Sequence, residues 1–200
     1  QRLDPYGRPA DPPLLISDEP SYPNQNYHPD VACDISRDIF HVVWSYARSE
    51  TERDIHTRAI SQVTKFNDID NWPFYTRTLG VGVGDFNISP SIACNSEDNN
   101  CLVVYENGDS GGGDIRASLM TVYPTYLEFY DYSISSYASY EGHPDVAWAG
   151  DENEYLVVWE YWKIPVSGDP HWAIYYRTLW DTNQTDSQLK QDGEWLLYYS

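Results

Sequence analysis

The stretch His143–Glu160, HPDVAWAGDENEYLVVWE, decides the fold of this chain, because the chain contains it in three versions. The first version is His28–Ser45, HPDVACDISRDIFHVVWS, and the second is Ser89–Glu106, SPSIACNSEDNNCLVVYE. The three align without a gap, and the first and third share HPDVA at the start and VVW near the end. An internal repeat of this kind predicts a row of equivalent structural units that bury their apolar side chains against one another.

Each version of the repeat predicts two short strands joined by a polar turn. The second strand, with the sequence FHVVW, CLVVY or YLVVW, is apolar at almost every position. In the third version, strand alternation places Tyr155, Val157 and Trp159 on one face, and Leu156 and Val158 on the other. A strand with two apolar faces is expected to be buried on both of them.

Two more strand-like segments follow each version of the repeat. The third segments are 54–60, 114–120 and 173–179, and the fourth segments are 72–79, 126–133 and 194–200. No segment combines a 3.6-residue apolar period with the capping residues of a helix. The sequence therefore predicts an all-β protein made of four-stranded antiparallel units.

Four strands per unit, returning at Pro29, Pro90 and Pro144, are typical of the blades of a β-propeller. A β-sandwich is the alternative, but it does not explain why the same residues return at the same place. The phrase PDVA…YLVVWE…I..R resembles the blades of secreted bacterial and archaeal β-propeller repeat proteins, and the resemblance covers nearly the whole chain after residue 27. It implies a propeller-like fold and says almost nothing about function. The Asp-box of sialidases and the Gly-His and Trp-Asp signatures of WD40 blades are absent from the sequence.

The repeat divides the chain into an N-terminal arm and three predicted blades. The arm is 1–27, and the blades are 28–88, 89–142 and 143–200. Closed propellers have about four to eight blades, so three blades predict two uncovered apolar faces. We therefore expect the chain to associate with copies of itself into a ring or a filament, unless it is part of a longer chain with more blades.

The arm holds six of the 13 prolines, which remove backbone donors and block helix formation. Its one apolar cluster, Leu14-Leu15-Ile16, precedes the first repeat, where a later repeat has the segment Tyr126–Ser135. The arm is therefore expected to be extended and to supply an outer strand, either to its own sheet or to a neighbouring molecule by strand addition.

The composition is acidic, with a formal net charge of −19 and only three lysines among 200 residues. Such a chain repels phosphate backbones and anionic lipids, so we expect neither nucleic acid nor a membrane as a partner. No apolar run approaches the roughly 20 residues of a membrane-spanning helix. The abrupt start at Gln1 and the Asn-x-Ser/Thr triplets at Asn87 and Asn183 favour an exported glycoprotein, outside the cell or on its surface, although Pro90 weakens the first triplet.

The three cysteines divide into a predicted pair and a single residue. Cys94 and Cys101 flank the polar turn of a predicted hairpin, which brings them opposite each other and within reach of a disulfide. Two reduced, half-buried thiols are the alternative. Cys33 occupies the position of Cys94 in the first repeat and is expected to be a small buried apolar residue.

Candidate functional residues gather at one predicted end of the units, where the first strand starts and the second strand leads into the third. The His-Pro-Asp starts bring two pairs there, His28 with Asp30 and His143 with Asp145. A His and an Asp two residues apart on a strand face the same way, so these pairs are candidates for metal binding or acid–base chemistry. The alternative is a structural role at the strand entry, which the middle repeat favours because it has serine at both positions.

The richest loop at this end is Tyr161–Trp172, YWKIPVSGDPHW. Its flat aromatic rings and carboxylate suit stacking against a sugar, and capping of the blade edge by the tryptophans is the alternative. The candidate ligand-binding residues of this loop are Trp162, Asp169, His171 and Trp172.

Calcium is the one cofactor for which the sequence contains candidate ligands. The loop NGDSGGGD carries oxygen ligands at Asp109 and Asp114, but it lacks the ligand spacing of an EF-hand loop. A polar turn is the alternative explanation, and no other cofactor is expected.

The sequence contains no P-loop, Gly-x-Ser-x-Gly, His-Glu-x-x-His or zinc-type cysteine motif, so we assign no catalytic residue. Our first hypothesis is a non-enzymatic extracellular structural or binding module that self-associates. The alternative is a carbohydrate-binding or glycoside-hydrolase-like domain with its site on the loop end. The first carboxylates to consider for hydrolysis are Asp30, Asp145, Glu106 and Glu160.

Overall fold

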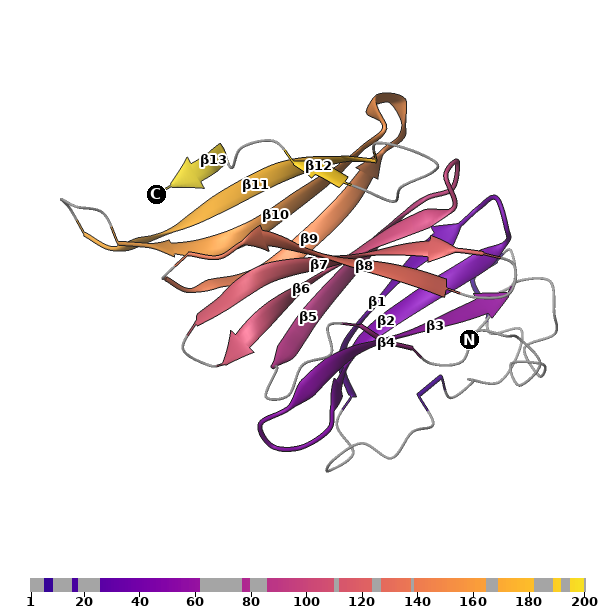
Figure 1. Ribbon diagram of the computed structural model, residues 1–200, viewed down its shortest axis with the longest axis horizontal. Helices are drawn as coiled ribbons and strands as arrows, with labels where there is room; N and C mark the ends of the chain where they lie inside the picture. Colours follow the sequence, from indigo (N-terminus) through magenta and orange to yellow (C-terminus); the bar gives the residue numbers. More distant parts are fainter. Residues whose placement is uncertain are drawn as a thin grey trace.

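The computed structural model describes a chain built from antiparallel β-strands, and its described residues include a single-turn 3-10 helix at Gly150–Glu152 (Figure 1). The described residues are 6–8, 16–17, 26–61, 77–79, 86–109, 112–123, 127–137, 139–164, 169–181, 189–191 and 195–199. The all-β prediction is confirmed. Among these residues, no helix has the length and apolar character needed to cross a membrane.

The strands fall into three consecutive units. Unit 1 consists of β1 (Asn26–Asp34), β2 (Ile39–Ala47), β3 (Arg53–Ser61) and β4 (Arg77–Leu79). Unit 2 consists of β5 (Asn87–Asn95), β6 (Asn100–Asp109), β7 (Gly112–Val122) and β8 (Leu127–Ser135). Unit 3 consists of β9 (Glu141–Ala149), β10 (Glu154–Lys163), β11 (His171–Asp181), β12 (Leu189–Gln191) and β13 (Trp195–Tyr199). Both β12 and β13 pair with β11, and β12 is not among the strands that the sequence predicts.

Consecutive strands pair antiparallel from the inner first strand to the outer edge of each unit, except that β12 and β13 both pair with β11 and not with each other. Unit 1 forms a four-stranded sheet by itself. Units 2 and 3 share a nine-stranded sheet, but a single residue pair, Gly113 with Glu141, joins them. The described residues therefore form two antiparallel sheets, and these sheets close into neither a barrel nor a ring.

The register is the same in all three units. The central valines of the second strands are Val42, Val103 and Val157. Their partners on the first strands are Val31, Ile92 and Val146, and their partners on the third strands are Arg58, Ser118 and Arg177. The repeat in the sequence is thus a repeat in three dimensions.

The apolar cores lie between the units. The core between units 1 and 2 contains Ile39, Val43, Ile55, Ile92, Val103, Tyr105 and Met120. The core between units 2 and 3 contains Leu102, Val104, Ile115, Leu119, Val146, Tyr155, Val157 and Trp159. Neighbouring residues of β6 alternate between the two cores, so this strand is buried on both faces, as its sequence predicts.

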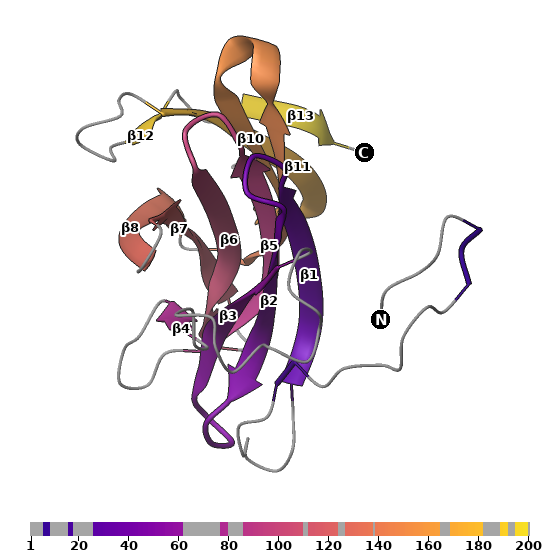
Figure 2. The ribbon, with the colours of Figure 1, turned by 90° about the vertical axis from the view of Figure 1, so that its right-hand side faces the viewer.

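The inner strands β1, β5 and β9 pack side by side, with β5 in the middle. The units therefore extend from a shared inner edge, and Figure 2 shows β8 and β12 on the side of the molecule away from β1. Residues of β5 therefore lie close to their counterparts in both β1 and β9.

Each inner strand carries the same irregularity at the start of the repeat. His28, Ser89 and His143 have φ angles of 47°, 52° and 49°, and each is followed by proline. The pairing with the second strand is interrupted here by a register shift. A non-glycine residue seldom adopts a positive φ, so this conformation is a property of the repeat that redirects the side chains around it.

Unit 3 has one face that the described residues leave uncovered. Leu156 is 37% exposed, whereas its equivalents Leu102 and His41 are fully buried. The prediction that YLVVW is buried on both faces is therefore wrong for Leu156, because no described unit packs on that side of β10.

Unit 1 has the opposite face uncovered. Val31 is 55% exposed, whereas its equivalents Ile92 and Val146 are 5% and 9% exposed. Val42 is half-buried, although Val103 and Val157 are fully buried. The two end units thus expose complementary sides of the same repeat.

Part of the N-terminal arm lies against unit 1. The carbonyl oxygen of Ile16 accepts a hydrogen bond from the guanidinium of Arg58 on β3. The hydroxyl of Ser17 accepts one from Asn26 Nδ2 at 3.2 Å. Leu14 and Leu15 lie outside the described residues, so an outer strand formed by the arm stays a prediction.

Candidate functional site

One residue from each unit meets its counterparts at the shared inner edge. The buried hydroxyl of Ser91 on β5 lies 3.0 Å from Asp30 Oδ2 on β1 and 2.7 Å from Asp145 Oδ1 on β9. The backbone N–H of Ile92 donates to the same Asp30 oxygen at 2.9 Å. Each aspartate also accepts a hydrogen bond from the backbone N–H of the residue that follows it.

This contact explains why a serine suits position 91 of the middle repeat. Ser91 supplies a hydroxyl proton between two carboxylates, where a third aspartate would add repulsion between like charges. In the part of the chain that the structure describes, no group of three or more His, Cys, Asp or Glu side chains is placed to hold a metal ion. The inner edge is a hydrogen-bonded contact between units.

The two residues of the predicted His143–Asp145 pair have different partners. His143 Nδ1 lies 3.3 Å from Glu160 Oε2, whereas Asp145 faces Ser91. His28 is exposed. The left-handed backbone at each histidine and the register shift after it break the strand alternation on which the pairing prediction depended.

A second polar group lies where unit 2 meets unit 3. Glu106 on β6 is 3% exposed, and its carboxylate accepts a hydrogen bond from the backbone N–H of His143. A Cβ added to Gly113 would lie 2.6 Å from Glu106 Cγ, and one added to Gly142 would lie 2.8 Å from Glu106 Oε2. Burial raises the pKa of Glu106, and the charge and hydrogen bond of His143 oppose this rise.

Glu160 has in unit 3 the position that Glu106 has in unit 2, but its side chain is 44% exposed and pairs with His143. Tyr140 interacts with both carboxylates. Burial, followed by the charges of Glu106 and Glu160, raises the pKa of Tyr140. A tyrosine phenol carries its proton at neutral pH, so Tyr140 is available as a donor.

Aromatic rings border these polar groups. Trp162 and Trp172 lie opposite each other in the pairing of β10 with β11, and their ring centroids are 5.1 Å apart. Tyr140 meets Trp172 edge-on at 5.5 Å, and the backbone carbonyl oxygen of Tyr140 accepts a hydrogen bond from the backbone N–H of Trp162 at 2.8 Å. Trp172 is 48% exposed. The structure thus brings together the two tryptophans of the predicted loop site, while His171 Nδ1 lies 3.0 Å from the carbonyl oxygen of Asp169.

Sequence reasoning missed Tyr140 and gave Glu106 no specific partner. The available signal was the glutamate that follows the apolar run in two of the three repeats, at Glu106 and Glu160. Tyr140 precedes the repeat and carries no such signal. Its proximity to Trp172 and the carboxylates depends on how units 2 and 3 pack.

The predicted disulfide is present. Cys94 and Cys101 lie opposite each other in the pairing of β5 with β6, with Cα atoms 4.0 Å apart, and their sulfurs are bonded. Cys33 is half-buried, which is less than its apolar role predicts.

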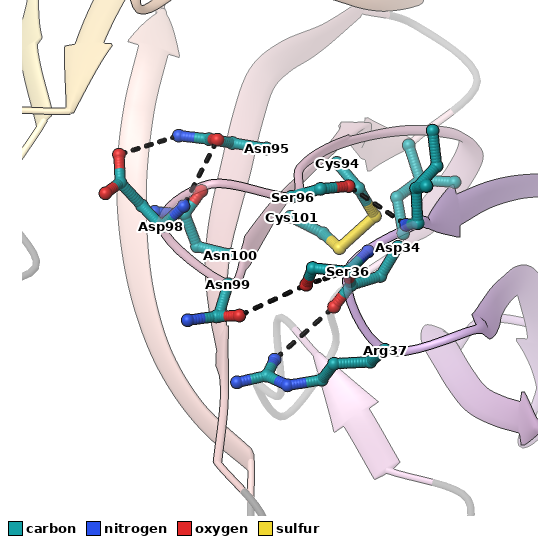
Figure 3. The surroundings of a disulfide bond; sticks show 12 residues. Asp34, Ser36, Arg37, Cys94, Asn95, Ser96, Asp98, Asn99, Asn100 and Cys101 are labelled. Carbon is teal, nitrogen blue, oxygen red and sulfur yellow. Dashed lines mark hydrogen bonds and ion pairs between the residues drawn. A yellow bond between two sulfur atoms is a disulfide. The ribbon is translucent and has the colours of Figure 1, made fainter.

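Figure 3 shows the disulfide next to the contact between the first turns of units 1 and 2. The hydroxyl of Ser96 accepts a hydrogen bond from the backbone N–H of Ile35 at 3.0 Å. The hydroxyl of Ser36 donates to Asn99 Oδ1 at 3.3 Å. The disulfide therefore fixes the hairpin that holds unit 1 at this end.

The two predicted glycosylation sites differ in what the structure describes. Asn87 is fully buried, and its side-chain oxygen accepts a hydrogen bond from Asn107 Nδ2 at 2.7 Å. A glycan on this amide does not fit such a position. Asn183 lies outside the described residues.

The loop proposed for calcium gains no support. Asp114 pairs with Arg116 at 3.6 Å, which accounts for its charge. The side chain of Asp109 lies outside what the structure describes, and only its backbone pairing with Gly112 is known. A calcium site here stays a hypothesis.

No protein-family model and no curated protein matches this sequence.

Proposed function

We propose that this chain is a non-enzymatic extracellular module of propeller-like blades that associates with copies of itself through its two open faces. One observation carries the proposal: the residues exposed on these faces are the equivalents of residues that are buried between the units. The disulfide supports an extracellular location, because such bonds persist in oxidising compartments.

The open face of unit 3 has the pattern with which unit 2 holds unit 3. Leu102, Val104 and Ile115 of unit 2 are fully buried against the next unit. Their equivalents in unit 3 are partly exposed at Leu156, Val158 and Ile174. The apolar pattern is kept although the described residues contain no unit to cover it.

The open face of unit 1 has the complementary pattern. Ile92 and Val103 of unit 2 are buried against unit 1, and their equivalents Val31 and Val42 are exposed and half-buried. Docking unit 1 of one copy on unit 3 of another would repeat an interface that the chain already makes between its own units. Burying one large aliphatic side chain contributes roughly 1.5–3 kcal/mol, so a few such residues support a stable contact.

A polar contact would accompany this docking. Inside the chain, Glu106 of one unit accepts a hydrogen bond from the N–H of His143 of the next unit. On the open faces, Glu160 and His28 occupy the same two positions. Two copies with three units each would supply six blades, a number that closes in known propellers, and a docking angle that does not close would give a filament.

The experiment is sedimentation velocity on the intact chain over a range of concentrations, with Leu156→Glu as the test variant. A charge at the centre of the open face should abolish association and leave a folded monomer. Ile164→Glu is the matched control, because Ile164 is 67% exposed and lies beyond the end of β10. A wild-type chain that stays monomeric at every concentration would contradict the proposal.

A second candidate function is carbohydrate binding or glycoside hydrolysis, which the contacts of Trp172 favour. An aromatic ring that is 48% exposed lies against Tyr140, which interacts with Glu106 and Glu160. A sugar face stacks on such a ring, while the neighbouring phenol and carboxylate can hydrogen-bond its hydroxyl groups.

A glycan array followed by calorimetry tests this candidate. Trp172→Ala should lower affinity at least about tenfold for any glycan that binds, the equivalent of 1.4 kcal/mol or more, and Ile164→Ala should not change it. Release of sugar by the wild type but not by Glu160→Gln would place the site among the hydrolases. An array without a bound glycan would remove the candidate.

A further inference from the structure

Two arginines at equivalent positions make the same contact with different parts of the chain. Arg177, on the third strand of unit 3, donates a hydrogen bond to the carbonyl oxygen of Ile134 on β8, the outer strand of the preceding unit. Arg58, on the third strand of unit 1, donates to the carbonyl oxygen of Ile16 in the arm. With respect to unit 1, Ile16 therefore takes the place of an outer strand of a preceding unit.

The residue that follows repeats the comparison. Ser135 follows Ile134 and donates to Glu141 Oε1 at 2.5 Å, at the start of the next inner strand. Ser17 follows Ile16 and accepts from Asn26 Nδ2, at the position equivalent to Glu141. Two consecutive residues of the arm thus contact the same two positions as two consecutive residues of β8, although the serine hydroxyl donates in β8 and accepts in the arm.

The end of β8 that Arg177 contacts has a recognisable backbone form. The pairing of β7 with β8 shifts register at Ile134, which is left out between Ser133 and Ser135. The pairing of β11 with β13 shifts in the same way at Leu197, which is left out between Leu196 and Tyr198.

The strand register shows that these two irregularities lie at equivalent positions in units 2 and 3. Ile115 pairs with Ser135 and its equivalent Ile174 pairs with Tyr198, so Leu197 of unit 3 corresponds to Ile134 of unit 2. The described residues of β4 pair regularly with β3. In the next unit, the third strand β7 has Ser118 at the position of Arg58 and Arg177. At this position of the third strand, unit 3 has Arg177 and follows a unit whose outer strand has an irregular end. Unit 2 has Ser118 and follows the regular β4. Unit 1 also has an arginine, Arg58, at this position.

We propose that Arg58 and Asn26 form a docking site for the irregular end of β13 from a second copy of this chain, and that Ile16 and Ser17 occupy this site until the second copy displaces them. The inference rests on the proposed self-association and adds its polarity, since unit 3 of one copy meets unit 1 of the next. It also makes the arm a competitor of assembly, because both segments use the same two residues.

The test holds the arm in place by an added disulfide. Ser17 Oγ and Asn26 Nδ2 are 3.2 Å apart, so the double variant Ser17→Cys/Asn26→Cys places two thiols on side chains that touch, and mass spectrometry identifies the fraction in which they have bonded. Sedimentation velocity should show that the oxidised variant associates at least about tenfold more weakly than wild type, because the open form is no longer populated. Adding reductant should restore association to the level of Ser17→Ala/Asn26→Ala, which lacks Asn26 in the same way.

Two controls accompany this variant. Wild type with the same reductant shows what loss of the Cys94–Cys101 disulfide does by itself, and Ser17→Ala/Asn26→Ala removes the hydrogen bond without locking the arm. An oxidised variant that associates as wild type does would overturn the docking site while leaving self-association in place. A wild type that never associates would overturn both.

Deletion of residues 1–20 provides an independent measurement with opposite outcomes. If the arm competes with a second copy, its removal should strengthen association a few-fold, since the competent fraction rises. Weaker association after the deletion would show that the arm links copies, and would overturn the competition.

Discussion

At the scale of single residues, the departures from the repeat carry more information than the matches. Ser91 replaces aspartate in the middle unit, and this position is the one that faces the aspartates of both neighbours. From the sequence alone, this serine indicates only that a metal site built from the three repeats would be incomplete. The structure shows a hydroxyl between two carboxylates, a role that a third aspartate would fill only when protonated.

The first prediction concerns this hydroxyl. Ser91→Ala should lower the free energy of unfolding by roughly 1–2 kcal/mol, because Asp30 and Asp145 then face each other without the donor. Urea unfolding measures the change, with Ser89→Ala as a control in the same strand. Adding Asp145→Asn should recover much of the loss, since an amide can donate to Asp30. A Ser91→Ala chain as stable as wild type would remove the energetic role of this contact.

At the scale of elements, the hairpin between the first two strands of each unit depends on one left-handed residue. Asp38, Asn99 and Asn153 have φ angles of 53°, 58° and 55° at equivalent positions. Asp and Asn tolerate this conformation better than other non-glycine residues, because their short side chains bond to the local backbone. The choice of residue is therefore local, and the turn can be predicted from sequence.

The second prediction tests that turn. Asn153→Val should destabilise the chain by about 1–2 kcal/mol, because a β-branched side chain is strained at positive φ. Asn153→Gly should be neutral or slightly stabilising, since glycine adopts this backbone freely. Thermal unfolding of the two variants side by side gives the comparison. Equal melting temperatures would mean that the turn has another conformation in solution.

At the scale of the whole molecule, stability comes from faces that meet between units. His41 shows what such a face does to a polar residue. It lies on the same side of β2 as Ile39 and Val43, it is fully buried, and its ring nitrogens have no hydrogen-bond partner among the described residues. Burial lowers the pKa of His41 to about 4, with Asp34 opposing this.

The third prediction follows from the sign of this shift. Between pH 6.5 and about 4 the unfolded chain binds a proton at His41 and the folded chain does not, so stability falls as the pH falls. The contribution of His41 to this loss is at most roughly 1.4 kcal/mol per pH unit. Below about pH 4 both states are protonated and the slope ends.

His41→Leu should reduce this acid sensitivity, because leucine is the equivalent residue in units 2 and 3. Urea unfolding at pH 7 and pH 5 measures the difference. His56, whose pKa burial also lowers to about 4, retains part of the effect. The matched control is His28→Leu at the exposed start of β1, and an unchanged pH dependence in His41→Leu would contradict the burial of its ring.

Much of the fold could be predicted from the sequence because its causes are local or repeated. The alternation of Val103 with Leu102 and Val104 predicts a strand between two sheets, and the spacing of Cys94 and Cys101 across a turn predicts their bond. Both depend on strand geometry, which is the same wherever a strand forms. The candidate site could be predicted only in part, because the partners of its side chains depend on how the units pack against one another.

The sequence by itself determined that the chain contains a repeated unit of antiparallel strands, since a hydrophobic pattern that repeats must form the same element each time. Only the tertiary structure decided that Ser91 contacts two aspartates and that His143 pairs with Glu160. It also decided that Arg58 bonds to Ile16 as Arg177 bonds to Ile134. The reason is physical. Strand period and turn chemistry act over a few residues, whereas these contacts join atoms far apart in the chain whose distances are set by how the inner strands pack.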